Sequence, residues 1–290
     1  MSFLPALARS LAALARRNRS ATVGVTLVAA LMLFAIVGPL LASHDPYTSE
    51  FQRGVGSNLL PVGPNGEFLL GTDRLFRDVF SRLATAARIS LFIGIAATLI
   101  ATSIGALVGV LAGWFEGRLL DTALMRIVDV GLAFPFLLLV MSLSAALDRT
   151  TPLTMLLTLG LTGWLGTARI VRAKTMQIRG LDFVTASRAL GQSTPQIIRR
   201  HVLPNITGPL MVVATVSVAQ MILAESVLSF LGAGIAPPTP TWGRMLFEGA
   251  DYFTTSPWIA LAPGLAIMAS VLGFNLLGEG LRDALDPRKQ

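Results

Sequence analysis

The sequence contains no cysteine and few charged residues, and both absences exclude whole classes of protein. Without cysteine, neither disulfides nor thiol chemistry is available. Charged residues make up 13% of the 290 residues, whereas a soluble domain carries about 25%. Hydrophobic residues make up 53%, and the mean hydropathy is +0.68. This composition predicts an integral membrane protein that sits in a lipid bilayer.

Catalytic and metal-binding arrangements are missing as well. The two histidines, His44 and His201, lie far apart, so no His/Cys cluster has metal-ligand spacing and we expect no metal site. No phosphate-cradling Gly-Lys-Ser/Thr loop occurs, so the chain is not expected to hydrolyse ATP by the P-loop route or to be an enzyme. The formal net charge is +7, but its distribution is typical of loops on the cytoplasmic side of a membrane. No nucleic-acid partner is expected.

Long apolar runs predict six membrane-spanning helices. Each is near the roughly 20 residues that cross a 30 Å hydrocarbon core. Pro135 is expected to kink the third span. Gly105, Gly109 and Gly113 lie on one face of the second span and predict close helix packing. The spans cover roughly residues 21–42, 89–112, 124–146, 153–171, 206–231 and 258–277.

The distribution of lysine and arginine predicts that both termini lie in the cytoplasm. Residues 1–20 carry four arginines and no acid, which predicts an interfacial amphipathic helix, with a signal peptide as the alternative. The segment 169–200 carries seven basic residues, whereas the expected outer loop at 232–257 has only Arg244. The expected outer loop at 43–84 is an exception with four arginines, but long loops follow the rule poorly.

Residues 181–205 form a polar stretch between two apolar runs. Its helix-capping and helix-breaking residues predict two short helices joined by a turn, which we call the elbow. Asp182 is the expected N-cap of a first helix over 183–190, and Gly191 is its expected left-handed C′ residue. Thr194 is the expected second N-cap, with Pro195 at the first helical position. The second helix is expected to run over 196–202 and to end before Pro204.

The first helix of this elbow is dense in small residues, which let another surface approach its backbone closely. They are Thr185, Ala186, Ser187 and Ala189. The alternative is an ordinary polar connector between two spans. Such a connector has little need to combine a glycine that ends one helix, a proline that begins the next and a face of small residues.

This pattern resembles the EAA loop of the membrane subunits of bacterial ABC importers, which reads Glu-Ala-Ala, three residues, Gly, and a stretch ending near Leu-Pro. Thr185 stands where the family has glutamate, and Ser187 departs from alanine. In that family the loop forms a coupling helix that docks into the ATP-hydrolysing subunit. The resemblance implies an ATPase-coupling role for Asp182, Thr185, Ala186, Ser187, Ala189, Leu190, Gly191, His201 and Pro204.

A second resemblance lies in the expected outer loop. The signature Gly-Thr-Asp-x-x-Gly-Arg-Asp of the dipeptide, oligopeptide and nickel permease family is matched by Gly71, Thr72, Asp73, Arg77 and Asp78. Phe76 replaces the signature's second glycine. The alternative for this piece is a charged amphipathic helix at the outer headgroup level. Residues 225–246 and 263–288 also look like this family, so the resemblance extends to the C-terminus.

The resemblance implies an all-α fold with six membrane-spanning helices, similar to type I ABC importer permeases of the C type. It divides the chain into a cytoplasmic segment 1–20, a first helix and external loop 21–84, a permease core 85–281 with a coupling loop 172–205, and a cytoplasmic tail 282–290. The implied partners are a second related permease, two ATP-binding subunits and an extracytoplasmic binding protein. ATP and magnesium would be bound by those partners, so no cofactor is expected here.

The implied function is import of short peptides across the bacterial inner membrane. Alternatives are the same architecture moving nickel, glutathione, short glycans or antimicrobial peptides, and a stand-alone secondary transporter. The latter predicts inverted repeats and buried charges near the midplane, which the sequence does not show. Glu225 is the most informative acid within a span, near the outer end of the fifth helix. It is either a pathway or gate residue, or a hydrogen-bonded packing group.

Overall fold

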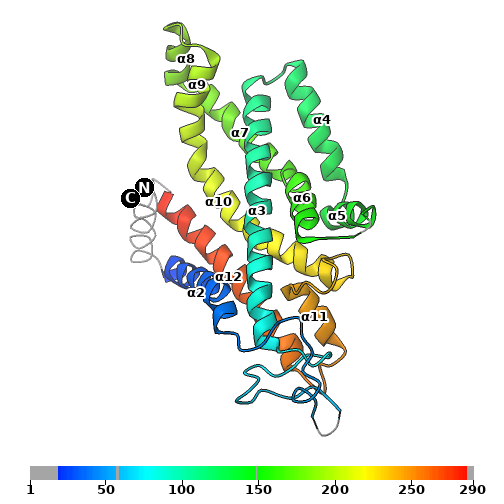
Figure 1. The fold of residues 1–290 in the computed structure, drawn as a ribbon. Coiled ribbons are helices and arrows are strands. Elements are labelled where there is room, and N and C mark those ends of the chain that lie inside the picture. Colours follow the sequence, from blue (N-terminus) through cyan, green and yellow to red (C-terminus); the bar gives the residue numbers. More distant parts are fainter. Residues whose placement is uncertain (1–18, 57–58, 148, 286–290) are drawn as a thin grey trace.

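The computed structural model describes residues 19–56, 59–147 and 149–285. The expected interfacial helix at 1–20 therefore lies almost wholly outside the described residues. The described residues form helices joined by loops, and their only strand-like pairings are two isolated β-bridges. Figure 1 shows an elongated helical bundle with α8 and α9 at one end and the long α2–α3 loop at the other. We call these the elbow end and the loop end.

The membrane-spanning helices follow the predicted order, although several have other bounds, and α11 lies within the segment 232–257 that was expected to be loop. The helices are α2 (Arg19–Leu41), α3 (Val79–Trp114), α4 (Leu119–Ala133), α5 (Phe136–Ala145), α6 (Pro152–Thr162), α7 (Leu165–Arg179), α8 (Asp182–Ala189), α9 (Thr194–Ile197), the π-helical η1 (Ile198–Val202), α10 (Leu203–Phe230), α11 (Trp242–Ala250) and α12 (Trp258–Leu285). Within the described residues, five helical runs are long and apolar enough to cross a membrane, or six when α4 and α5 count as one span.

The central helix α3 is longer than the sequence predicted. It has 36 residues and begins at Val79, inside the segment expected to be loop. Asp78 caps it, because its carboxylate accepts a hydrogen bond from the Ser81 backbone N–H at 2.9 Å. The signature residues before Asp78 lie in loop, so the alternative of an amphipathic helix at the headgroup level was wrong. The boundary expected at residue 84 falls within α3.

The third span is broken rather than kinked. The helices α4 and α5 are bent by 86° at the residues between them. Phe134 (φ −90°, ψ 135°) and Pro135 (φ −57°, ψ 125°) are both extended. Proline disfavours the helical conformation of the preceding residue and supplies no N–H to continue the helix. Both effects act at this point, so α5 lies across the bundle at about half its height (Figure 1).

Pro204 does not end the second elbow helix, contrary to the prediction. The helical run continues from Thr194 through η1 into α10 and reaches Phe230. Pro204 has no N–H for the carbonyl one helical turn earlier. The wider π turn over Ile198–Val202 directly precedes it, and such turns accommodate an interrupted hydrogen-bond ladder.

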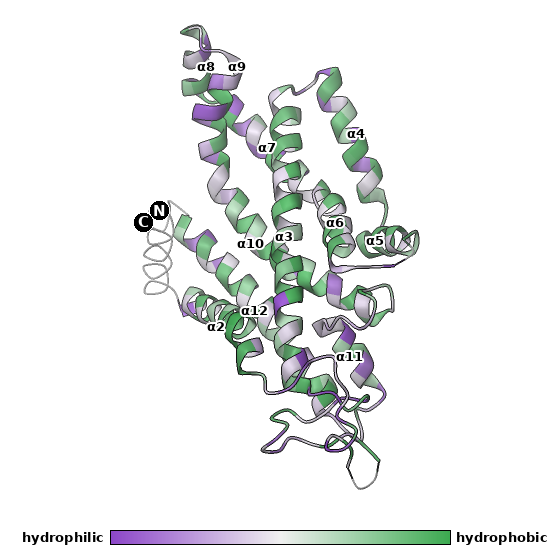
Figure 2. Cartoon of the chain, in the orientation of Figure 1, coloured by the Kyte–Doolittle hydropathy of each residue, from purple (hydrophilic) through white to green (hydrophobic). Residues whose placement is uncertain are grey.

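The core lies where α10, α11, α12 and α2 pack around α3. Trp242 of α11 is fully buried, and its indole N–H donates to the Leu83 carbonyl of α3 at 3.3 Å. Figure 2 shows apolar residues along the middle of the bundle and hydrophilic residues gathered on α8, α9 and η1. Hydrophilic residues also lie on α11 toward the loop end (Figure 2), so polar groups occur at both ends of the bundle.

Candidate functional site

The inner face of α8 fixes the elbow to the bundle. Val184 is fully buried and Ser187 is 7% exposed. The Ser187 hydroxyl donates to the Phe183 carbonyl at 2.8 Å and lies 3.2 Å from His201 Nε2. The Phe183 and His201 rings are 5.6 Å apart between centroids. Two residues of the predicted coupling set, Ser187 and His201, are thus brought together, and they join α8 to η1.

A Schellman motif ends α8 at the predicted glycine. Gly191 has φ +83°, which is the left-handed region. Its N–H donates to the Arg188 carbonyl at 2.9 Å, and the Gln192 N–H donates to the Ser187 carbonyl at 3.1 Å. A Cβ added at Gly191 would have no atom within 4 Å. Glycine is therefore required here by backbone conformation and not by space.

Both predicted N-caps of the elbow are displaced by one residue. Asp182 is the first helical residue of α8, and its N-cap is Leu181, which offers no side-chain cap. The second N-cap is Ser193, which forms a capping box with Gln196. Thr194 is then the first helical residue and Pro195 the second, where a missing N–H is also harmless. The serine–glutamine pair outcompetes the threonine because it satisfies two backbone groups.

The outer face of α8 is small and exposed. Thr185, Ala186 and Ala189 are all exposed, and next to them Leu190 is 81% exposed. A short helix with one face anchored and the other offering small side chains beside one large apolar one suits close contact with a second protein. A plain connector needs no such face.

Tight helix packing links the elbow to the spans. The Arg188 guanidinium of α8 lies 4.6 Å from the ring centroid of Trp114, the last residue of α3. Along α3, a Cβ added at Gly109 would lie 2.6 Å from the Ala168 carbonyl oxygen of α7. One turn on, a Cβ at Gly113 would lie 2.6 Å from the carbonyl oxygen of the facing turn of α7. The predicted glycine face is therefore in backbone contact with α7, which leads directly into α8.

An ion pair that the sequence analysis missed joins α4 to α7. Arg172 donates from Nε and Nη2 to the two carboxylate oxygens of Asp121 at 2.7 and 2.8 Å. Asp121 also accepts from the Gly117 backbone N–H at 3.1 Å. The two residues are distant in sequence, so no spacing rule pairs them. This fork-to-fork geometry holds α4 against the helix that carries the elbow.

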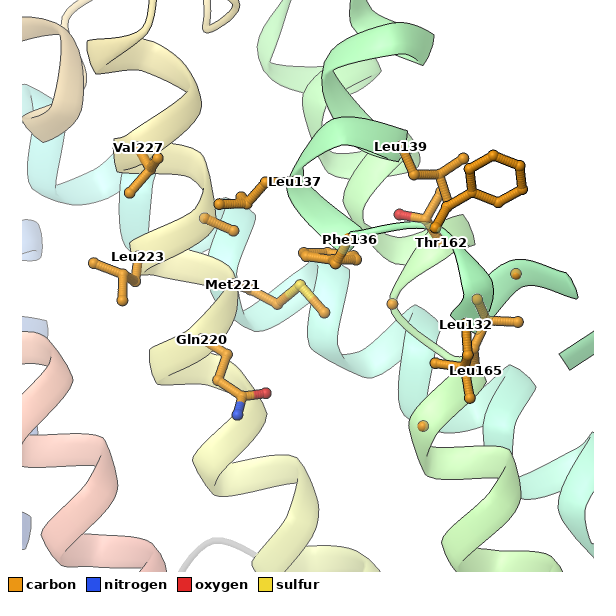
Figure 3. A pocket seen from close by; sticks show the side chains of 15 residues that line it. Leu132, Phe136, Leu137, Leu139, Thr162, Leu165, Gln220, Met221, Leu223 and Val227 are labelled. Atoms are coloured by element: carbon orange, nitrogen blue, oxygen red, sulfur yellow. The ribbon is translucent and has the colours of Figure 1, made fainter. Parts of the chain in front are cut away.

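A cavity of about 440 Å³ lies between α4, α5, the α6–α7 junction and α10 (Figure 3). Two breaks between helices border it, namely the α4–α5 break at Phe134 and the α6–α7 junction at Gly163. Thr162 and Gln220 are the only residues with polar side chains in its lining. The lining comprises Gly131, Leu132, Phe134, Phe136, Leu137, Leu139, Thr162, Gly163, Leu165, Gly166, Gln220, Met221, Leu223, Ala224 and Val227.

Glu225 does not line this cavity. It is fully buried in the last turns of α10. Its carboxylate accepts from the Ser229 hydroxyl at 2.8 Å and from the Ser90 hydroxyl of α3 at 3.3 Å. Ser90 in turn accepts from the Trp242 backbone N–H at 3.3 Å. These contacts favour the packing alternative for Glu225, and a pathway role stays a prediction.

The signature in the loop end is part of a buried ion cluster. Arg77 binds Asp73 at 2.7 Å and Glu248 of α11 at 2.9 Å. Arg82 reaches the same two carboxylates at 3.2 Å each, and Arg244 binds Glu248 at 3.0 Å. Pulling the loop away would leave buried charges of this cluster without an opposite charge, which is strongly unfavourable. The cluster therefore holds the loop against α3 and α11.

Phe76 shows why the signature has glycine at this position. Its φ is +60°, a left-handed conformation that L-residues with bulky side chains rarely adopt. The Asp73 carboxylate accepts from the Leu75 and Arg77 backbone N–H groups at 2.8 and 3.0 Å, which holds the turn closed. The turn thus keeps its shape without the glycine.

Comparison with known proteins places this architecture in a family. The sequence model of the family described as binding-protein-dependent transport system inner membrane component matches residues 105–290, which is more than half of the chain. This chain belongs to that family. A second family model, the N-terminal TM domain of oligopeptide transport permease C, matches residues 15–61. The predicted membership of the ABC importer permeases is therefore confirmed.

Relatives of this inner membrane component match over nearly the whole chain. A putative peptide transport system permease protein of Brucella abortus is 40% identical over 272 residues, which cover 94% of this chain and 89% of the relative. The oligopeptide transport system permease protein of Bacillus subtilis is 37% identical, with 94% and 87% covered. The di/tripeptide transport system permease protein of Pseudomonas aeruginosa is 39% identical, with 93% and 89% covered.

The fold of this inner membrane component also matches a solved transporter. The structure is that of the MetNI methionine ABC transporter in an inward-facing conformation. The TM-score is 0.56 at 20% identity, over 70% of this chain and 96% of the other chain. The chain is thus an all-α, multi-pass membrane protein with the type I ABC importer permease fold, as predicted.

Proposed function

We propose that this permease forms half of the translocation pathway of an ATP-driven importer of short peptides, and that α8 is where separate ATPase subunits act on it. The observation that supports the coupling role is the two-faced α8. Its inner face is anchored through Val184 and Ser187, and its outer face offers Ala186, Ala189 and the highly exposed Leu190. The peptide substrate is supported by the names of the relatives.

On this proposal the chain itself is not catalytic. Its partners are a second, related permease, two ATP-binding subunits that hold ATP and magnesium, and an extracytoplasmic binding protein. Among the described residues, no group of three or more His, Cys, Asp or Glu side chains is placed to hold a metal ion. On the same proposal, the role of this chain is to receive a movement at α8 and to pass it to the helices around the cavity.

The packing supports a route for that movement. The elbow continues directly into α10 through η1, and α7 is in backbone contact with α3 at Gly109. Packed helices move as units because their interiors have the density of organic crystals. A displacement of α8 would then tilt α7 and α10 together, and the lining of the cavity includes residues of both.

We further propose that the elbow end and both termini lie in the cytoplasm of a bacterium, with the loop end outside the inner membrane. The support is the concentration of basic residues around the elbow. Reporter fusions after Arg179 and at the C-terminus should be cytoplasmic, whereas fusions at Gly56 and Pro238 should be external. An external C-terminus would overturn this orientation.

The test of the function is purification of the chain with its neighbours. We expect it to co-purify with a second permease and two ATPase subunits, and the complex to show ATPase activity that a peptide-loaded binding protein stimulates. A chain that transports alone, without ATPase subunits, would be a secondary transporter. The ligand of the binding protein separates peptides from nickel, glutathione and glycans.

A further inference from the structure

Gln220 is an unpaired amide in the middle of a membrane-spanning helix. The helix α10 runs for 28 residues from Leu203 to Phe230. At 1.5 Å per residue, Gln220 lies about 26 Å from its start and about 15 Å from its end. Its side chain is exposed and forms no hydrogen bond with residues 19–56, 59–147 or 149–285. A carboxamide facing hydrocarbon without a partner is costly, so its position calls for water, a polar ligand or a polar group of the proposed second permease.

The cavity beside Gln220 carries a second, independent sign of water. Phe134 and Pro135 have extended backbone at about half the height of the bundle, and Phe134 is 58% exposed. Non-helical backbone at membrane depth persists only where it is buried in protein or lines a water-filled cavity. Phe134 is not buried within this chain and borders the cavity, which fits the second condition.

The chemistry of the lining selects the kind of molecule that fits. The only other polar side chain, Thr162, already donates to the Thr158 carbonyl at 2.6 Å. Gln220 is left with an amide donor and a carbonyl acceptor, the same pair that a peptide bond presents. The lining has no carboxylate, imidazole or thiol, so it lacks the side chains that commonly bind a bare divalent metal ion such as nickel.

We propose that this cavity is an aqueous part of the translocation route, and that Gln220 is the contact for main-chain amides of the passing peptide. The inference rests on the proposed function for its substrate. A single neutral amide recognises what all peptides share, and the apolar walls beside it accept varied side chains. Figure 3 shows Gln220 and Met221 on the α10 side of the cavity, across from Leu132 and Leu165.

The first test asks whether Gln220 meets water, and it uses the natural absence of cysteine. In membranes that contain the complete transporter, we expect Gln220→Cys to react with a charged methanethiosulfonate reagent. The matched control is Leu99→Cys on α3, where Leu99 is 61% exposed but does not line the cavity. At least tenfold faster labelling of Gln220→Cys supports the proposal. Equal rates at the two positions overturn it.

The second test asks what Gln220 binds. Proteoliposomes with the complete transporter and its binding protein are supplied with a mixture of labelled di- and tripeptides. We expect Gln220→Leu to lower uptake about threefold to tenfold, the value of one lost hydrogen bond, with stimulated ATPase activity retained. Gln220→Asn should keep part of the uptake. Unchanged uptake in Gln220→Leu, or loss of complex assembly, would overturn the assignment.

The two proposals fail in different ways. If the wild-type complex takes up none of the peptides, the proposed substrate is wrong, while the cysteine labelling still decides whether the cavity is wet. If the wild type takes up peptides and Gln220→Leu does so equally well, the proposed function stands and the amide contact is wrong.

Discussion

Replacement of Gly191 by valine tests whether the angle of the elbow carries the coupling. Gly191 has φ +83° and open space around its Cβ position, so the substitution acts through backbone strain alone. A left-handed conformation costs an L-residue about 1–2 kcal/mol, and more when the side chain is β-branched. A free-energy difference of about 1.4 kcal/mol changes an equilibrium tenfold. The population of the native elbow conformation should therefore fall at least about fivefold to thirtyfold relative to other conformations of this segment. We expect normal insertion and a loss of transport.

Gly232 provides a closely matched control. It also has φ +83° and no atom within 4 Å of an added Cβ, but it follows the end of α10 that is remote from α8. Gly232→Val therefore carries the same local strain at the other end of α10, about 42 Å along the helix from the elbow. The assay is ATPase activity of the reconstituted complex with and without peptide-loaded binding protein. Normal stimulation in Gly191→Val, or an equal loss in both variants, would refute the reasoning.

The other predictions concern docking, packing and the buried acid. Ala186→Glu places bulk and charge on the outer face of α8, so the variant should insert normally into the membrane but lose stimulated ATPase activity. Ala186→Ser should retain that activity. Retention in both variants would mean that the docking surface lies elsewhere. Gly109→Leu should force α3 and α7 apart and lower the yield of folded protein in detergent, measured by size-exclusion chromatography, whereas Gly66→Leu, in open space, should not. Glu225→Ala should lower the thermal unfolding temperature in detergent, since Ser90 and Ser229 lose a buried acceptor worth about 1–3 kcal/mol. The isosteric Glu225→Gln should lower that temperature less. Selective loss of transport in Glu225→Gln at normal stability would instead favour the pathway role.

Local signals in the elbow were readable from the sequence. Gly191 was predictable because few positions other than a helix C′ residue favour glycine after a helical run, and its φ confirms the prediction. The cap at Thr194 was misplaced because its neighbour Ser193 also fits the N-cap position, whereas α8 begins after Leu181, which has no capping side chain and therefore gives no signal in the sequence. Ser193 wins since Gln196 completes a capping box, and a preference list for single residues does not contain that reciprocity.

The interruptions of the spans were harder to predict. A proline within an apolar run predicts a disturbance, but not whether the helix bends, breaks or continues. Pro135 breaks its span by 86°, whereas Pro204 lies within a continuous helical run behind a π turn. The difference depends on how the preceding backbone can rearrange against its neighbours, which is a property of the packed bundle.

Long-range pairs lay beyond the sequence altogether. Asp121 and Arg172 meet only because α4 folds back along α7, and Arg77 meets Glu248 only because α11 returns to the start of α3. Gln220 did have a local signal, as the lone amide in the middle of the fifth apolar run. This signal is weak, because a neutral amide costs less to place within a membrane than a charged side chain and is therefore a poorer indicator of function.

The length of α3 sets the distance between the proposed docking surface and the lipid. Its 36 residues correspond to about 54 Å, which exceeds by about 10 Å a membrane of roughly 40–45 Å that includes the headgroups. Trp114 ends this helix and holds Arg188 of α8. If α3 begins at the outer surface of the membrane, α8 stands clear of the headgroup layer on the proposed orientation, and an ATPase would meet it in bulk water. Docking would then depend on the shape of two protein surfaces and be indifferent to the charge of the surrounding lipid.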